Sequence, residues 1–177
     1  MKINGIHCMK YMGSKNRIAK HLLPIMLAEC EKHGVTKWVE PFVGGANMID
    51  KVPDNFERIG YDLNDHVIHA LIGIRDHVND LPSVVSEDFY KSIKGTPPNP
   101  ITSVLRFGCA FGGVFETTFA RDRKTGRNFA EETKRNALKQ SPKIQNVQFI
   151  CDSYENLSFE NTLIYCDPPY AGTSGYK

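Results

Sequence analysis

The chain has 177 residues, of which 41% are hydrophobic and 24% charged, and its formal net charge is +2. This length fits one domain with a sizeable core, and the composition is that of an ordinary globular protein. No apolar run approaches the roughly 20 residues of a membrane helix, and the N-terminus lacks the apolar run of a signal peptide. Five cysteines, an odd number without paired spacing, indicate reduced thiols. We therefore expect a cytoplasmic location and no membrane partner.

Basic residues are concentrated between Arg106 and Lys143. This stretch has nine Lys or Arg residues against four Asp or Glu residues, so it carries +5 while the rest of the chain carries −3. The distribution indicates local phosphate binding, although a solvated helix face explains the same charges equally well. The candidate phosphate contacts are Arg121, Arg123, Lys124 and Arg127.

Helices and strands are expected to alternate up to about residue 80. The expected elements are a helix capped by Ser14 that ends before Gly34, a strand over 37–40, a short helix over 46–51, a strand over 58–62 and a helix that begins at Asn64 or Asp65. Pro24 predicts a kink or a split in the first helix. Trp38 is expected in the core.

Prolines and glycines between Leu81 and Pro100 indicate an insertion that leaves the core, with one helix over 87–93. Residues 101–143 predict a small subdomain with a helix before Gly108 and another over 130–140. The core resumes with apolar strands over 147–151 and 163–166, and Phe149 is expected to be buried. Continuous apolar strands that alternate with helices are typical of an α/β parallel sheet.

Candidate binding residues follow the strands, because ligands bind at the carboxyl ends of open parallel sheets. The adjacent Gly44 and Gly45 allow backbone amides to approach a ligand. Asp62 ends the second strand 17 residues after Gly45, near the roughly 20-residue offset at which an acid binds ribose hydroxyls. Asp152 and Asp167 end the next two strands. A glycine turn with one acid is explained equally well as a structural turn.

The run Asp167-Pro168-Pro169-Tyr170 is more specific. Two prolines after a strand cannot continue the ladder, and they keep carbonyl acceptors without N–H donors. A carboxylate beside a free carbonyl can accept both hydrogens of an exocyclic amine, and a tyrosine offers a flat face to a planar ring. The arrangement suits a flipped base, and the alternative is a turn that only ends the strand.

Four motifs in this order resemble those of the Dam-like (D12 class) DNA adenine-N6 methyltransferases. They are Lys10-Tyr11-Met12-Gly13-Ser14-Lys15, Glu40-Pro41-Phe42-Val43-Gly44-Gly45-Ala46-Asn47, Tyr61-Asp62-Leu63-Asn64-Asp65 and Asp167-Pro168-Pro169-Tyr170. The segment 111–132 resembles the phage-type branch of the family. The resemblance covers essentially the whole chain.

The resemblance implies a Rossmann-like methyltransferase sheet that binds S-adenosyl-L-methionine and acts on double-stranded DNA in a bacterial or phage-infected cell. It implies a catalytic domain over 1–80 and 146–177 and a mostly helical target-recognition subdomain over 81–145. The implied cofactor-binding residues are Tyr11, Lys15, Phe42, Gly44, Gly45, Asn47, Asp62, Asp152 and Asp167. The implied catalytic residues are Asp167, Pro168, Pro169 and Tyr170.

Two departures from the family pattern stand out. Gly44-Gly45-Ala46 replaces the usual Gly-x-Gly spacing of the cofactor loop. The family normally continues for several elements beyond the Asp167 motif, so the resemblance implies a truncated chain with an exposed fourth strand. Such a chain is expected either to need a second chain that completes the sheet or to be inactive.

Three alternatives remain open at this point. The same fold methylates cytosine N4 or a protein amide, although Asp167 before the prolines favours adenine by resemblance. A non-catalytic remnant that binds DNA or cofactor is the second alternative. His66 and His69 at i, i+3 allow a zinc site, but polar residues on a helix face explain them better.

Overall fold

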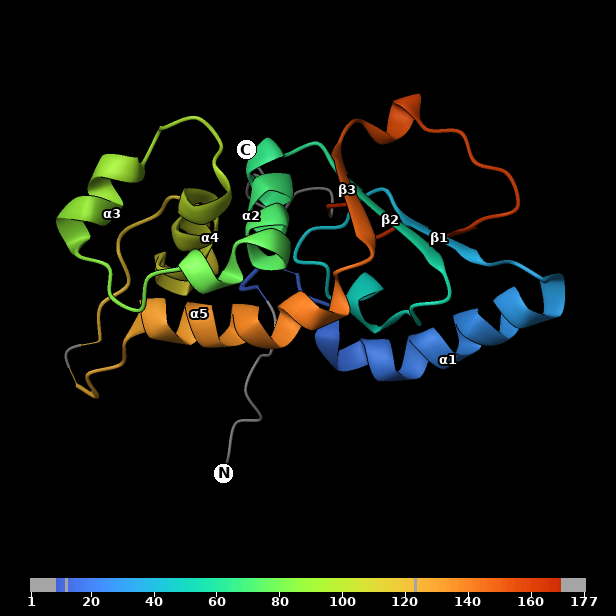
Figure 1. The fold of residues 1–177 in the computed structure, drawn as a ribbon, viewed down its shortest axis with the longest axis horizontal. Helices are drawn as coiled ribbons and strands as arrows, with labels where there is room; N and C mark the ends of the chain where they lie inside the picture. Colours follow the sequence, from blue (N-terminus) through green and yellow to red (C-terminus); the bar gives the residue numbers. More distant parts are fainter. Residues whose placement is uncertain (1–8, 12, 123, 170–177) are drawn as a thin grey trace.

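The computed structural model describes residues 9–11, 13–122 and 124–169 (Figure 1). The strands are β1 (Lys37–Glu40), β2 (Glu57–Asp62), β3 (Val147–Cys151) and β4 (Leu163–Ile164). The α-helices are α1 (Asn16–His33), α2 (Asp65–Asp76), α3 (Glu87–Ile93), α4 (Pro100–Gly108) and α5 (Phe129–Gln140). Short 3-10 helices lie between them: η1 (Ile49–Lys51), η2 (Val78–Asp80), η3 (Phe111–Gly113), η4 (Ser141–Lys143) and η5 (Tyr154–Asn156).

The four strands form one parallel sheet in the order β3-β2-β1-β4, which confirms the expected α/β class. β1 and β2 are central, so their carboxyl ends lie side by side. β4 is an edge strand of the described sheet, as expected, and is shorter than the predicted strand over 163–166. Its last contact with β1 is the bond from the Tyr165 N–H to the Val39 carbonyl at 2.9 Å. Pro168 and Pro169 then have no N–H with which to extend the ladder.

The two faces of the sheet are covered unequally. Trp38 and Phe149, both expected in the core, belong to a large cluster that α1, α2, α4 and α5 complete on one face. Trp38 is fully buried there. The opposite face carries a small cluster of Val39, Ile59 and Tyr61. Leu157 and Phe159, from the segment between β3 and β4, pack against that small cluster.

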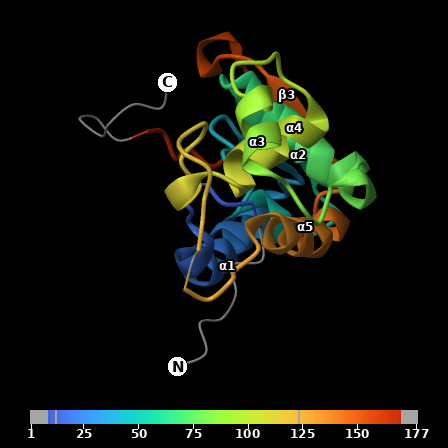
Figure 2. The ribbon, with the colours of Figure 1, turned by 90° about the vertical axis from the view of Figure 1, so that its left-hand side faces the viewer.

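Helix α4 packs directly on α2, and this contact joins residues 81–145 to the sheet. A Cβ placed on Gly73 of α2 would lie 2.2 Å from the Pro100 carbonyl oxygen, so a glycine is required at the crossing. Val104 and Ala137 belong to the same core cluster as Trp38. Figures 1 and 2 show α3 and α4 on the side of α2 away from the sheet. The role of this segment in target recognition stays a prediction.

The helix ends follow the sequence closely, with one exception. Asn64 caps α2, because its side-chain oxygen accepts the His66 N–H at 3.0 Å. The exception is α1, which begins one residue later than a Ser14 cap implies and has Lys15 at its N-cap without a capping side chain. The helix continues through Pro24 without a split and ends at Gly34, whose φ of 67° is left-handed.

Candidate active site

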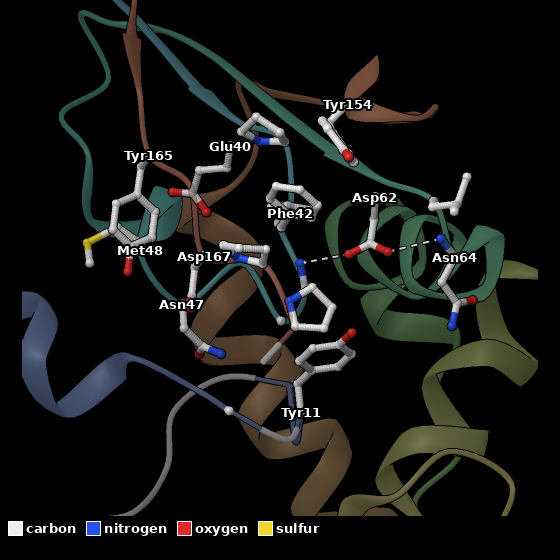
Figure 3. Close-up of a pocket in the computed structure, with 18 of the residues that line it drawn as sticks. Tyr11, Glu40, Phe42, Asn47, Met48, Asp62, Asn64, Tyr154, Tyr165 and Asp167 are labelled. Carbon is white, nitrogen blue, oxygen red and sulfur yellow. Dashed lines mark hydrogen bonds between the residues drawn. The ribbon is translucent and has the colours of Figure 1, made fainter. Parts of the chain in front are cut away.

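A pocket of about 970 Å³ opens at the carboxyl ends of β1, β2, β3 and β4 (Figure 3). This volume lies at the upper end of the range for small-molecule sites. The pocket brings together residues that are far apart in the sequence, and these include most of the expected site. The expected residues that line it are Tyr11, Lys15, Phe42, Gly44, Gly45, Asn47, Asp62, Asp152, Asp167, Pro168 and Pro169. Tyr170 lies outside the described residues.

The loop after β1 places the backbone of two glycine residues close to the Tyr11 side chain. A Cβ on Gly44, where φ is +48°, would lie 2.8 Å from Cε1 of Tyr11. A Cβ on Gly45 would lie 2.7 Å from Nδ2 of Asn47. Both glycines are therefore needed for the loop to close on Tyr11. The two adjacent glycines allow the close backbone approach that is expected of the usual Gly-x-Gly spacing.

Asp62 ties this loop to the end of β2. One carboxylate oxygen accepts the Gly44 N–H at 3.1 Å, and the other accepts the Asn64 N–H at 2.9 Å (Figure 3). Burial raises the pKa of Asp62, and the two backbone N–H donors oppose that rise. A carboxylate held in this way presents its remaining lone pairs to the pocket, where they suit paired hydroxyl groups.

Asp152 lies beside Asp62 at the end of β3. It accepts the Ser153 N–H at 2.7 Å and the Asn156 side-chain amide at 2.7 Å, so its orientation is fixed. The neighbouring Tyr154 ring lies 5.3 Å from the Phe42 ring, measured between centroids. Two carboxylates and an aromatic pair thus form one end of the pocket, which we call the β2–β3 end.

Asp167 follows β4 at the opposite end of the pocket. Its Oδ2 atom pairs with the Lys15 ammonium group at 2.7 Å, and Lys15 also donates to the Gly13 carbonyl at 3.0 Å. Lys15 therefore joins the N-terminal segment to the Asp167 motif, a contact that the sequence did not predict. Pro168 and Pro169 continue the pocket wall beyond the carboxylate.

Glu40, the last residue of β1, is a pocket residue that the sequence reasoning missed. It is fully buried, and its Oε1 atom accepts the indole N–H of Trp38 at 3.0 Å. Burial raises the pKa of Glu40 to about 8, and the Asp50 and Asp167 carboxylates act in the same direction. Glu40 is therefore protonated at neutral pH. Glu40, Lys15 and Asp167 make up what we call the β1–β4 end.

Asn47 carries an unsatisfied acceptor in the pocket. The residue is 6% exposed, and its Oδ1 atom is buried without a hydrogen-bond partner in the described structure. An orphaned buried acceptor has a large desolvation penalty, so it favours a ligand that brings a donor. The ammonium group of a bound amino acid moiety is such a donor. Asn47 and Asp62 thus offer the pocket one acceptor for an ammonium group and a carboxylate for hydroxyl groups.

The candidate DNA contacts lie outside the pocket. Arg121 forms an ion pair with Glu87, and Arg127 donates to both oxygens of Glu132 at 2.6 and 2.7 Å. Lys124 lies in the turn that the Asp122 side chain closes. Arg123 lies outside the described residues. Both arginine side chains remain about half exposed, so these pairs leave the basic surface accessible.

His66 and His69, the pair considered for zinc, have different surroundings. No group of three potential ligands is close enough to hold a metal ion among the residues that the structure describes. His69 pairs with Asp65 at 2.8 Å on the surface of α2, as the helix-face interpretation predicts. His66 instead lines the pocket, together with Phe115, and neither residue was expected there.

Two further observations concern the cysteines and the helices of the described residues. The four described cysteines are free thiols: Cys30, Cys109, Cys151 and Cys166. None of the described helices is long and apolar enough to cross a membrane.

Comparison with known proteins agrees with the chemistry of the pocket. Residues 11–96 match the family model of the D12 class N6 adenine-specific DNA methyltransferase. The chain is 22% identical over 196 residues to the type II methyltransferase M.FokI of Planomicrobium okeanokoites, an alignment covering 94% of this chain and 29% of the relative. It is 23% identical over 200 residues to the type II methyltransferase M.MjaIII of Methanocaldococcus jannaschii, with 92% and 68% covered.

The family match includes Tyr11, the loop after β1 and Asp62, and it ends before Asp152 and Asp167. The chain spans less than a third of the length of M.FokI and about two thirds of that of M.MjaIII. The chain is therefore similar to the D12 class N6 adenine-specific DNA methyltransferases over residues 11–96 and, at low identity, to two type II methyltransferases.

Proposed function

We propose that this chain binds S-adenosyl-L-methionine in the pocket and transfers its methyl group to N6 of adenine in double-stranded DNA. The proposal rests on one observation: the same pocket contains an end that suits the cofactor and an end that suits the amine. Asp62 and Asn47 suit the ribose and the amino acid part of the cofactor, and Asp167 with Pro168 suits an exocyclic amine. When bound, the cofactor supplies an electrophilic methyl group on a sulfonium.

The residues of the chain supply positioning and electrostatics. Asp167 and the Pro168 carbonyl accept the N6 hydrogens, which stabilises the positive charge that develops on the nitrogen. Lys15 holds one oxygen of Asp167, so the other oxygen is the one directed to the amine. The methyl–sulfur bond breaks as the methyl–nitrogen bond forms, and one N6 proton is then released. Alignment of the amine with the methyl group is the larger part of the rate gain.

The basic surface around Arg121, Lys124 and Arg127 is proposed to contact DNA phosphates. These side chains stand outside the pocket, so they suit the positioning of a duplex more than the reading of the transferred base. Their binding energy is expected to fall steeply with added salt.

The test is methyl transfer from tritiated S-adenosyl-L-methionine to duplex DNA, followed by nucleoside analysis. N6-methyladenine supports the proposal, and N4-methylcytosine would transfer the same chemistry to the other amine. Asp167→Ala should abolish incorporation while circular dichroism shows a folded protein. Binding of the cofactor without incorporation by the unmodified chain would instead support a binding module.

A further inference from the structure

One wall of the pocket is made by two aromatic rings that reach it from different elements. His66 comes from the first turn of α2, and Phe115 comes from the loop after η3. Their ring centroids are 4.8 Å apart, and the Phe115 ring lies 4.6 Å from that of Phe107 in α4. We call this pair the His66–Phe115 wall. The two rings are tilted by 37° to each other and give the pocket an aromatic side.

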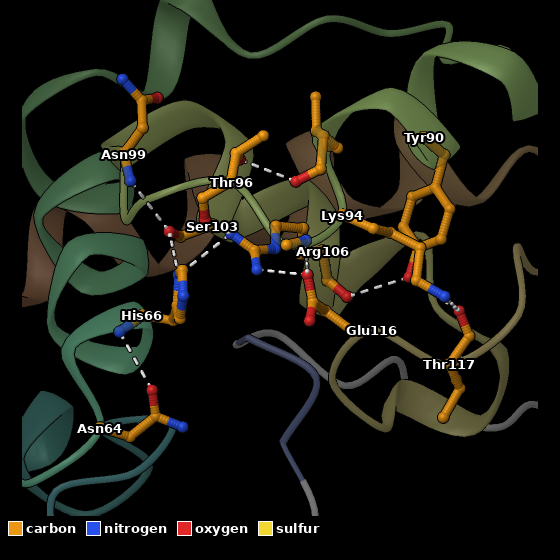
Figure 4. A network of polar contacts seen from close by, with 12 residues as sticks. Asn64, His66, Tyr90, Lys94, Thr96, Asn99, Ser103, Arg106, Glu116 and Thr117 are labelled. Carbon is orange, nitrogen blue, oxygen red and sulfur yellow. Dashed lines mark hydrogen bonds and ion pairs between the residues drawn. The ribbon is translucent and has the colours of Figure 1, made fainter. Parts of the chain in front are cut away.

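Arg106 of α4 contacts both residues of this wall, and Figure 4 shows it between His66 and Glu116. Its side chain is 1% exposed and does not line the pocket. It donates to the Thr96 carbonyl at 2.8 Å, approaches Nδ1 of His66 at 3.3 Å and forms an ion pair with Glu116. The guanidinium carbon also lies 4.8 Å from the centroid of the Phe115 ring. Its terminal nitrogens are held by these contacts, whereas its Nε atom has no hydrogen-bond partner among the described residues, so the support comes from the end of the guanidinium group.

Glu116, which pairs with Arg106, has a backbone conformation that is unfavourable for a residue other than glycine. Its φ of +55° lies in the left-handed region, which is unfavourable for a residue other than glycine. Two contacts fix its side chain: the ion pair with Arg106 and the Gly95 N–H at 2.7 Å. Such strain persists only where the surroundings impose it, and here it directs the adjacent Phe115 into the pocket.

We propose that the Arg106–Glu116 pair is a positioning device that fixes the His66–Phe115 wall and thereby sets the affinity of the pocket for its ligands. This inference rests on the proposed function only for the identity of the ligand. Neither residue touches the ligand, so both act through the wall. Burial and the nearby Arg106 charge lower the pKa of His66, which keeps its imidazole neutral and suited to stacking against a planar ring.

Glu116→Gly is the informative variant, because it removes the tie to Arg106 while glycine adopts the positive φ without strain. The positive φ at position 116 is therefore tolerated in the variant, and the change isolates the loss of the side-chain contacts. Glu116→Gln keeps an oxygen acceptor for Arg106 and Gly95 and serves as the rescue. Asp76→Asn is the matched control, because it removes the negative charge of the Arg75–Asp76 pair at the far end of α2, away from the pocket.

The first measurement is hydrogen–deuterium exchange of the unliganded chain. Glu116→Gly should increase exchange around residues 113–117 and in the first turn of α2, while Asp76→Asn leaves both segments unchanged. The second is calorimetry with S-adenosylhomocysteine, where Glu116→Gly should weaken binding by about tenfold or more, as expected for the loss of one charge-assisted contact. Glu116→Gln should recover most of that affinity.

Wild-type exchange around His66 in Glu116→Gly would overturn the proposal, as would a wild-type affinity for S-adenosylhomocysteine in that variant. If the unmodified chain binds no S-adenosylhomocysteine, the proposed cofactor is wrong, and the exchange data alone still decide whether the pair positions the wall. A wrong cofactor assignment and a wrong role for the Arg106–Glu116 pair would therefore give different results.

Discussion

The carboxyl groups at the two ends of the pocket differ in their hydrogen-bond and ion-pair partners. At the β2–β3 end, Asp62 and Asp152 are held by uncharged N–H donors from backbone and amide groups. At the β1–β4 end, Asp167 is held by the Lys15 cation, and Glu40 beside it is kept protonated by burial.

This difference leads us to propose which end of the pocket binds the cofactor and which end takes part in the reaction. A carboxylate fixed by neutral donors is a stable acceptor for hydroxyl groups whose charge does not change. A single carboxylate with a counter-charge and a neutral neighbour suits a nitrogen on which charge develops during the reaction. On the proposed function, we therefore propose that the β2–β3 end sets cofactor affinity and that the β1–β4 end sets turnover.

Asp167→Asn should give the largest effect, because it removes the charge that stabilises the developing cation. We expect turnover to fall on the order of 10²–10³-fold, as when a single electrostatic contact to a transition state is lost. Affinity for S-adenosylhomocysteine should change far less. Single-turnover kinetics and calorimetry measure the two quantities separately. Equal losses in both would break the division between the ends.

Asp62→Ala should give the reverse pattern. The Gly44 and Asn64 N–H groups lose their acceptor and the cofactor loses a hydroxyl partner, so affinity should fall by about 10- to 100-fold. Turnover at saturating cofactor should stay near that of the unmodified chain. Asp76→Asn, far from the pocket, is the control. A turnover loss as large as that of Asp167→Asn would contradict the assignment.

Glu40→Gln should change the pH dependence of stability. An unfolded glutamate ionises near its ordinary pKa of 4.5, whereas the folded one keeps its proton up to about 8. The favourable contribution of Glu40 is therefore complete below pH 4.5 and is lost as the pH rises towards 8, with a slope of up to about 1.4 kcal/mol per pH unit. Denaturant titrations of Glu40→Gln should lack this decline. Parallel curves for the two proteins would show that Glu40 is ionised when folded.

Asp152→Asn should have the smallest effect of the four. The amide oxygen can still accept the Ser153 N–H or the Asn156 amide, and the side chain is partly solvated. We expect cofactor affinity to fall only a few-fold, within the range of one neutral hydrogen bond. Calorimetry against Asp62→Ala would rank the two aspartates. A larger loss for Asp152→Asn would move the main cofactor contact from β2 to β3.

Strand and helix positions could be predicted from the sequence because local patterns determine them. The strands over 37–40 and 147–151 and the helix over 87–93 match the structure residue for residue. The Ser14 hydroxyl accepts the Asn16 N–H at 3.4 Å at the start of α1, but Lys15 is the N-cap residue and also pairs with Asp167. That pairing depends on contacts between distant parts of the chain, which local propensity does not contain.

The candidate site was predictable where it follows strand ends, as with Asp62 and Asp167. Glu40 was also visible as an acid that ends an apolar strand, but its neutral state depends on burial. His66 and Phe115 could not be found, because only the packing of α2 against α4 brings them together. Gly73, which permits that packing, appears in the sequence as an ordinary helical glycine.

The chain contains one tryptophan, and its position gives the molecule a built-in optical reporter. Trp38 donates to Glu40 and stacks on Tyr165, with the two ring centroids 6.4 Å apart. Its fluorescence should therefore respond to ionisation of Glu40 and to a ligand that moves Tyr165. Emission changes would then report selectively on events at the β1–β4 end, without any added label.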